Sequence, residues 1–168
     1  MIDWQHARNQ GTMPVKDGKP DQAYRLDKQI GFILRKASQR HLAIFATGIG
    51  DLTPTQFAAL AKLHECGPLS QIDLGRQTAM DAATIKGVID RLRERGLVVT
   101  IADKRDRRRL IVDLTEAGRA LFAARVDAAR AITRATLEPL DAPEQQMLLA
   151  LLARMAEGRE NEPGNGGK

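Results

Sequence analysis

Residues 70–115 read SQIDLGRQTAMDAATIKGVIDRLRERGLVVTIADKRDRRRLIVDLT. Two short helical patterns come first in this stretch, and two strand patterns then flank a basic turn. From Lys86 to Arg109 there are nine lysines and arginines against four acidic residues, an excess equal to the net charge of +5 of the whole chain. Basic and acidic residues balance in the rest of the sequence, so the positive charge is concentrated here. A concentrated basic patch indicates a surface that binds a polyanion such as DNA.

Two helices joined by a three-residue turn are predicted at the start of this stretch. Ser70 caps the first, which runs from Gln71 to about Gln77, and Asp81 caps the second, which runs to about Arg95. Both caps are residues whose side-chain oxygen accepts a hydrogen bond from the first turn of a helix. The arrangement is typical of a helix-turn-helix, whose second helix lies in the major groove of DNA.

The second helix of this pair has an apolar and a polar face. Its apolar residues recur at helical spacing and predict a buried stripe of Ile85, Val88, Ile89 and Leu92. The residues expected on the DNA-facing side are Ala82, Ala83, Thr84, Lys86, Gly87 and Arg91. Small side chains let the helix axis approach base edges, and Thr84 and Lys86 can bond to bases or phosphates. Taken alone, the same residues also fit an ordinary exposed face.

A hairpin with a basic tip follows this helix. Strands are predicted at Leu97–Ala102 and Arg109–Leu114 because both segments are rich in valine and isoleucine. The tip residues expected to contact DNA are Lys104, Arg105, Asp106, Arg107 and Arg108. Arginine is the preferred side chain in a narrow minor groove, so this tip is predicted to enter it. We interpret Asp106 as a brace that pairs with Arg108 or Arg91.

The predicted fold class is mainly α with a small β-ribbon, an α+β winged helix-turn-helix with dimerisation helices at both ends. An amphipathic helix is expected from about Asp21 to Thr47, with an apolar stripe that one small domain cannot cover by itself. Along the chain we expect a flexible arm (1–20), a dimerisation helix (21–50), the DNA-binding domain (51–114), C-terminal dimerisation helices (115–157) and a disordered tail (158–168).

Composition excludes several classes of protein. The 168 residues are 43% hydrophobic and 28% charged, which suits one globular domain. The longest apolar runs are far shorter than the roughly 20 residues that cross a membrane, and the N-terminus does not read as a signal peptide. The one cysteine fits a reducing cytoplasm. We expect neither a cofactor nor an enzyme, because no metal-ligand cluster, phosphate-binding loop or catalytic triad is evident.

The order of helix-turn-helix, RLRERGLV and DKRDRRRLIVDLTEAG resembles the winged-helix regulators of the MarR family. The resemblance implies that Asp106-Arg107-Arg108 forms the wing tip and that Arg108 enters the minor groove. It also implies recognition-helix contacts at Ala82, Thr84, Lys86 and Gly87, where Gly87 replaces the polar or basic residue of some members. Members of this family are homodimers, pair through their terminal helices, and commonly repress transcription until a small, often aromatic and acidic, ligand releases the DNA.

A site for such a ligand is predicted from two histidines and two arginines. His41 and His64 interrupt the apolar stripes of two helices, and Arg35 and Arg40 flank the first of them. An imidazole pair with an arginine nearby can bind a carboxylate and a ring hydroxyl. The expected effector is therefore a small aromatic carboxylate, and the regulated genes would serve the breakdown of that compound or resistance to it. Both histidines also fit the interpretation of satisfied core or interface residues.

Two alternative functions stay open on the sequence alone. A sequence-independent architectural protein would share the basic wing but show little preference among DNA sequences. A thiol-based redox regulator would use Cys66, although its position near a helix C-terminus and beside Glu65 disfavours the thiolate.

Overall fold

The computed structural model describes residues 24–102 and 110–158. The elements in chain order are η1 (Leu26–Lys28), α1 (Ile30–Gly48), α2 (Pro54–Cys66), β1 (Leu69–Ser70), α3 (Gln71–Gln77), α4 (Ala82–Glu94), β2 (Val98–Ala102), β3 (Leu110–Leu114), α5 (Glu116–Leu137) and α6 (Ala142–Glu157). The chain forms two compact units, Met1–Lys36 and Ala37–Lys168, and α1 passes from the first into the second. The arm at 1–20, nearly all of the tail at 158–168 and the wing tip lie outside the described residues.

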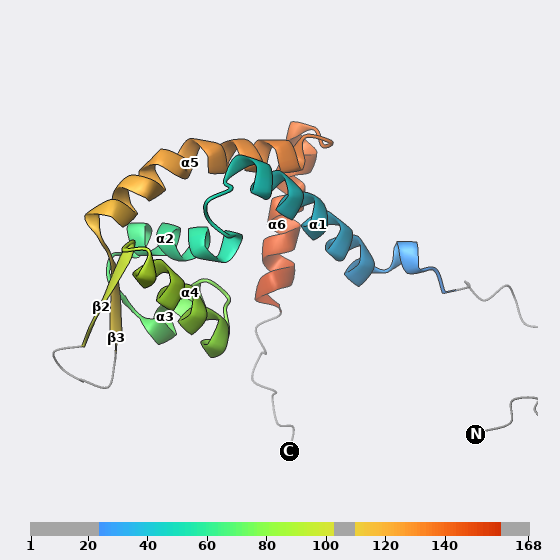
Figure 1. Cartoon of the computed structure of the whole chain (residues 1–168). Helices are drawn as coiled ribbons and strands as arrows, with labels where there is room; N and C mark the ends of the chain where they lie inside the picture. The colour runs from blue at the N-terminus through green and yellow to red at the C-terminus, as the bar shows by residue number, and fades with distance from the viewer. Residues whose placement is uncertain (1–23, 103–109, 159–168) are drawn as a thin grey trace, which may run out of the picture. The chain divides into compact units, whose positions relative to one another are not determined.

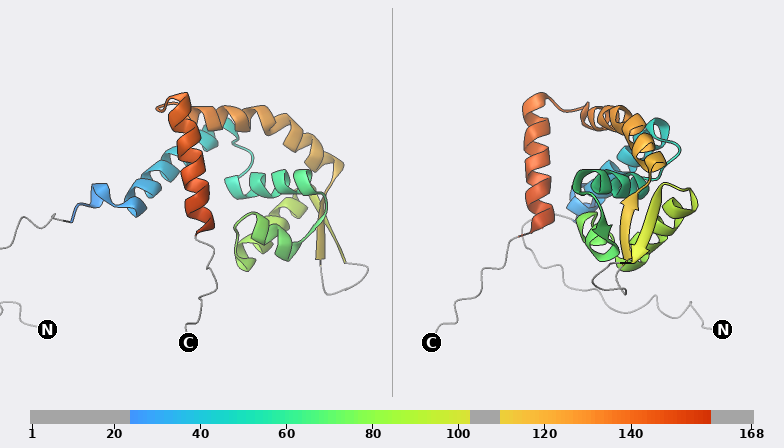
Figure 2. Two further views of the ribbon diagram at one scale, coloured as in Figure 1. Left: turned by 180° about the vertical axis from the view of Figure 1, so that it is seen from behind. Right: turned by 90° about the vertical axis from the view of Figure 1, so that its left-hand side faces the viewer.

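Within the second unit, α2, α3 and α4 lie beside the hairpin of β2 and β3, and α5 runs from the end of β3 across α2 (Figure 1). From behind and from the side, α6 stands apart from α2, α3 and α4 (Figure 2). No residue of α6 is buried. None of the described helices is both long and apolar enough to cross a membrane.

Capping residues begin the helices, and at Ser70 and Asp81 they do so at the predicted places. Thr53 and Gln56 form a capping box at α2, with Pro54 at its first position, and Asp141 and Glu144 form another at α6. The Ser70 hydroxyl accepts from Asp73 N at the start of α3. These reciprocal bonds satisfy N–H groups that have no partner inside the helix. The predicted winged helix-turn-helix and its mainly helical class are therefore confirmed.

The prediction of a single helix from about Asp21 to Thr47 is wrong at its start. Leu26–Lys28 forms a 3-10 turn, and Gln29 after it is extended with ψ of 130°, so the α-helix begins only at Ile30. Arg25 at the cap position of this turn makes no capping bond and instead pairs with Asp27 at 2.9 Å. Apolar spacing continues through this segment, but no cap supports a longer helix.

The prediction of a two-stranded ribbon is also corrected, because the sheet has three strands in the order β1-β3-β2. Leu69 pairs with Val112 and Ser70 with Ile111, both antiparallel. β2 and β3 pair from Val98↔Leu114 to Ala102↔Leu110, within one residue of the predicted strands. A strand of two residues has no alternation that could reveal it in a sequence.

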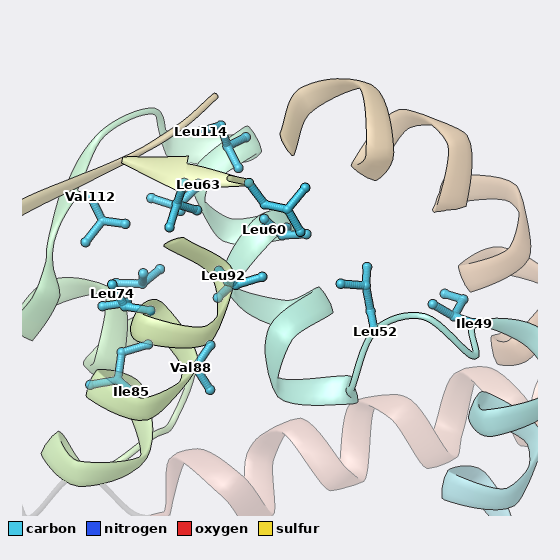
Figure 3. Packing of buried hydrophobic residues seen from close by; sticks show 14 of the residues in the cluster. Ile49, Leu52, Leu60, Leu63, Leu74, Ile85, Val88, Leu92, Val112 and Leu114 are labelled. Atoms are coloured by element: carbon cyan, nitrogen blue, oxygen red, sulfur yellow. The ribbon is translucent and has the colours of Figure 1, made fainter. Parts of the chain in front are cut away.

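The hydrophobic core joins the helix-turn-helix to the sheet and to α2. Leu60, Leu63, Leu74, Leu92 and Val112 are each at most 1% exposed. Figure 3 shows these side chains pointing toward one another from α2, α3, α4 and β3. This core holds α4 by one face, so its opposite face stays available to a partner.

Close backbone packing fixes the angle between α3 and α4. A Cβ atom on Gly75 would lie 3.1 Å from both Ile85 Cγ2 and Met80 O. Thr78 Oγ1 donates to Leu74 O at 2.6 Å, and Ala79 in the turn has φ of +52°. This left-handed conformation is uncommon for a residue with a side chain, so the turn is held by its surroundings.

The first turn of α5 lies directly against the backbone that follows α4. Thr115 Oγ1 donates to Gly96 O at 2.7 Å, and Thr115 N donates to Leu97 O at 3.1 Å. A Cβ atom on Gly118 would lie 2.0 Å from Leu97 O. Only glycine therefore fits at this position.

We predict that Gly118→Ala lowers the free energy of unfolding by roughly 3 kcal/mol, at the upper end for an overpacked site, because the Cβ meets a backbone oxygen that cannot turn away. Urea unfolding followed by circular dichroism measures this effect. Gly87→Ala is the matched control: the Cβ would lie 3.4 Å from the Arg91 guanidinium, so stability should rise by up to about 1 kcal/mol through helix propensity. Equal stabilities of the two variants would contradict the packing account.

Candidate nucleic-acid interface

The two faces of α4 are divided as the sequence predicts. Ile85, Val88, Ile89 and Leu92 are each at most 2% exposed. The exposed residues on the opposite side are Ala82, Ala83, Thr84, Lys86 and Arg91, and Gly87 among them is half-buried. Short side chains at three of these positions leave the first two turns of α4 open to close approach.

Asp81 fixes the N-terminus of α4. Its carboxylate accepts from Thr84 N at 2.8 Å and from Thr84 Oγ1 at 2.9 Å. The hydrogen bond from the Thr84 backbone N–H, and to a smaller extent the one from its hydroxyl, hold the pKa of the Asp81 carboxyl below its usual value. The group is therefore ionised near neutral pH, which also suits the positive end of the helix dipole.

Asp90 engages two cations of the same helix. Lys86 Nζ lies 3.2 Å from Asp90 Oδ2, and an Arg93 guanidinium nitrogen lies 2.9 Å from Asp90 Oδ1. Lys86 is 69% exposed and Arg93 50%, so both can turn toward a phosphate. Exposed pairs of this kind contribute little to stability and dissociate readily.

Gly87 is not required by the packing of the described residues, since a Cβ there would meet only the flexible end of Arg91 at ordinary contact distance. Glycine inside a helix costs about 1 kcal/mol relative to alanine. Its place on the exposed side of α4 therefore favours a role in close contact with a partner.

The predicted wing residues Lys104, Arg105, Asp106, Arg107 and Arg108 lie outside the described residues, and so does the pairing of Asp106 with Arg108 or Arg91. The paired strands β2 and β3 that carry this segment are described to Ala102 and from Leu110. The strand β2 contacts α4.

Asp51, in the loop before α2, connects the DNA-binding lobe to α5. Its carboxylate accepts two hydrogen bonds from Arg125, at 3.1 and 3.0 Å, and its backbone oxygen accepts from Arg95 at 2.8 Å. The bonds from Arg125 hold the pKa of Asp51 below its usual value. The sequence patterns did not single out Asp51, because its partners are 44 and 74 residues away.

A line of rings joins the two predicted histidines. The centroid of His41 lies 6.4 Å from that of Phe45, Phe45 lies 6.2 Å from Phe57, and Phe57 lies 5.6 Å from Phe122. His64 closes the line at 4.6 Å from Phe122. The two histidines of the predicted imidazole pair are therefore connected by a series of phenylalanine rings and are not in direct contact with each other in this series. Aromatic residues make up only 4% of the chain, yet three of its four phenylalanines gather here in the fold.

The predicted arginines have different surroundings. The Arg40 guanidinium donates to the backbone oxygens of Ala135 and Thr136 at the end of α5. His41 Nδ1 lies 3.0 Å from Thr136 Oγ1. Arg35 is exposed and belongs to the unit Met1–Lys36. Arg40 and His41 are thus held together at one end of the ring line.

Cys66 is exposed, and its Sγ lies 3.4 Å from Gln77 Oε1. Lys62 interacts electrostatically with Cys66. Among the described residues, no group of three or more His, Cys, Asp and Glu side chains could hold a metal ion.

Comparison with known proteins places this geometry in context. Residues 52–110 match the model of the MarR family. The transcriptional repressor NicR of Pseudomonas putida is 42% identical over 152 residues, which cover 89% of this chain and 96% of that protein.

Two solved structures share the fold over most of the chain. A probable transcriptional regulator from Pseudomonas aeruginosa is 60% identical, with a TM-score of 0.76, and covers 78% of this chain and 99% of its own. BpsR of Bordetella bronchiseptica, whose DNA binding is regulated by 6-hydroxynicotinic acid, is 40% identical with a TM-score of 0.78, and covers 81% and 99%.

We predict that Asp51→Asn lowers the Tm at pH 7, because it removes the charge that Arg125 binds. The folded-state pKa of Asp51 is lowered, so its stabilisation is present above the ordinary aspartate pKa of about 4 and is lost as the pH falls through the lower folded value. The Tm difference from wild type should therefore shrink on acidification below about pH 4.

The control is Asp127→Asn on α5, whose side chain is 94% exposed and pairs with Arg130. Its Tm should match wild type at every pH. A Tm difference for Asp51→Asn that stayed constant on acidification would show that the charge is not responsible.

Proposed function

Because this chain belongs to the MarR family of transcriptional regulators, we propose that it is a repressor that binds a pseudo-palindromic operator as a homodimer. It is a regulator and not an enzyme. The observation that carries the proposal is the exposed face of α4, with short side chains at its N-terminal end and a buried stripe behind it. We place its action in the cytoplasm, where the DNA is.

The proposed complex uses both parts of the winged lobe. In each subunit α4 lies in the major groove with Ala82, Ala83, Thr84, Lys86, Gly87 and Arg91 toward the bases and backbone. The tip from Lys104 to Arg108 reads the flanking minor groove through Arg108, braced by Asp106. Two such lobes would bind half-sites about one helical turn apart.

The terminal helices would form the dimer, as assigned to residues 21–50 and 115–157. Support comes from large apolar side chains on these helices that stay exposed in the single chain. On α6 they are Met147, Leu149, Leu151 and Met155, and on η1 and α1 they are Leu26, Ile30, Ile33, Leu34 and Leu42. Monomeric proteins rarely expose contiguous apolar surface of this kind.

For the effector we propose a small aromatic carboxylic acid of the 6-hydroxynicotinate type, the compound named for BpsR. Rings along the line from His41 to His64 offer stacking surfaces, and the imidazoles offer hydrogen bonds to a ring hydroxyl or carboxylate. Arg40, which is held beside His41, supplies the positive charge, and Arg35, in the unit Met1–Lys36, stays a predicted ligand residue. The regulated genes would then serve the breakdown of such an acid.

The first test is binding to the upstream DNA of the protein's own gene and to a scrambled sequence at near-physiological salt, with 6-hydroxynicotinate titrated into the complex. We expect selective binding that the acid relieves, while cyclohexanecarboxylate, which carries the same charge without an aromatic ring, leaves it intact. Equal affinity for both DNAs would instead support the architectural interpretation.

The same titration tests the effector residues. His41→Ala and His64→Ala should retain operator binding but require at least about tenfold more acid for release, the loss expected for one hydrogen bond to a charged group. Cys66→Ser is the control and should respond like wild type, to peroxide as well as to the acid. Normal release in both histidine variants would remove the ring line from the proposal.

For the wing we predict that Arg108→Ala weakens binding to all operator sequences and reduces the slope of log affinity against log salt by about one. Arg130→Ala on α5, where the side chain is 69% exposed, changes the net charge equally and should leave the slope unchanged. Salt titrations of both variants by fluorescence anisotropy measure the difference. Identical slopes would contradict insertion of Arg108 into the groove.

A further inference from the structure

The N-terminal turn of α4 carries a hydrogen-bond arrangement that bears on which bases it can read. Thr84 donates its backbone N–H to Asp81 Oδ1 at 2.8 Å and has its hydroxyl 2.9 Å from Asp81 Oδ2. An ionised carboxylate has lone pairs only and cannot donate. The single hydroxyl hydrogen of Thr84 must therefore point at Asp81.

The ionised state of Asp81 is secured by the same contacts. The N–H and hydroxyl of Thr84 keep the pKa of this carboxyl low, and the helix N-terminus favours a negative charge there. The direction of the hydroxyl hydrogen bond is thus the same at every pH near neutrality. Thr84 Oγ1 can therefore take part in a further hydrogen bond only as the acceptor.

Thr84 is exposed, and its neighbours on the helix surface do not compete with it for a base edge. Ala82 and Ala83 carry only methyl groups, and Gly87, one turn further along, carries no side chain. In a helix-turn-helix the N-terminal residues of the recognition helix contact the base edges. In the proposed complex, whether Thr84 Oγ1 donates or accepts a hydrogen bond consequently determines which base edge it can contact.

Resting on the proposed function, we propose that Asp81 is a specificity-determining positioning residue, which makes Thr84 an obligate acceptor that selects a base with an exocyclic amino group. In the major groove, adenine N6 and cytosine N4 donate, whereas guanine O6 and thymine O4 accept. At the position under Thr84, adenine and cytosine on the contacted strand are favoured over guanine and thymine. This division differs from purine against pyrimidine and from A·T against G·C. Read on the opposite strand, the favoured bases are the complements, thymine and guanine.

The test measures affinities for all four bases at every position of one operator half-site. Thr84→Val keeps the shape of the side chain and removes the hydroxyl, so it identifies the position that Thr84 reads. We expect wild type to discriminate there between the two classes by about tenfold, the usual effect of one mismatched base pair. The valine variant should lose that discrimination.

Asp81→Asn then reverses the polarity without removing the cap. Asparagine is as good an N-cap as aspartate, so its Oδ1 can still accept from Thr84 N and the Tm should be unchanged. Its amide N–H₂ donates to Thr84 Oγ1 and releases the hydroxyl hydrogen toward the DNA. The preference for adenine and cytosine over guanine and thymine at this one position should be lost or reversed. The ranking of bases at the other positions should not change.

Asp90→Asn is the matched control for charge. It removes a carboxylate from the same helix, and its present partners are Lys86 and Arg93 rather than Thr84. It should raise the affinity for every DNA sequence and leave unchanged the ranking of the four bases at the position that Thr84 contacts.

Two results would overturn the assignment of Asp81 while leaving the repressor in place: Asp81→Asn behaving like Asp90→Asn, or Thr84→Val keeping the division between the base classes. A different result, wild type that shows no preference among DNA sequences, would overturn the proposed function itself.

Discussion

The contact between the first turn of α5 and the backbone of Gly96 and Leu97 determines how the DNA-binding lobe joins the long helix. Thr115 bonds to both carbonyl groups, and Gly118 allows the helix backbone to touch Leu97 O. Since β3 enters this turn and α4 leads to Gly96, the contact sets the direction of α5 relative to α4. Asp51 adds a second connection further along, through Arg125 and Arg95.

Local signals in the sequence sufficed for most of the fold. Capping residues such as Thr53, Asp81 and Asp141 mark helix starts because their chemistry acts within three residues. The buried stripe of α4 follows from its spacing alone. The start of α1 and the strand β1 were not predictable in this way, because one depends on a missing cap and the other on pairing with a segment about 40 residues distant.

The residues of the candidate sites differ in the same way in how far the sequence could predict them. The outward residues of α4 were predictable, since helical geometry assigns them once the buried face is known. The ring line was not, because Phe57 and Phe122 lie on different helices and meet only in the folded chain. Likewise, the partners of Asp81 and Asp90 on α4 are near in sequence, but the distances that show which donors they engage come from the structure.

In the proposed complex, the acidic residues at the cap of α4 and on α4 itself have two separable effects. Asp90 lies beside cations that can turn to phosphates, so it tempers attraction to any DNA. Asp81 lies beside a hydroxyl and acts through the direction of one hydrogen bond. The first concerns strength of binding, and the second concerns its selectivity.

The cap at Asp81 also bears on how such a regulator diverges. Stable helices accept aspartate, asparagine or serine at this position almost equally, so exchange among them leaves folding intact. These residues differ in whether they can donate to Thr84. Under the proposed role of Asp81, descendants of one ancestral gene would acquire different operators through a change at the cap that leaves stability intact.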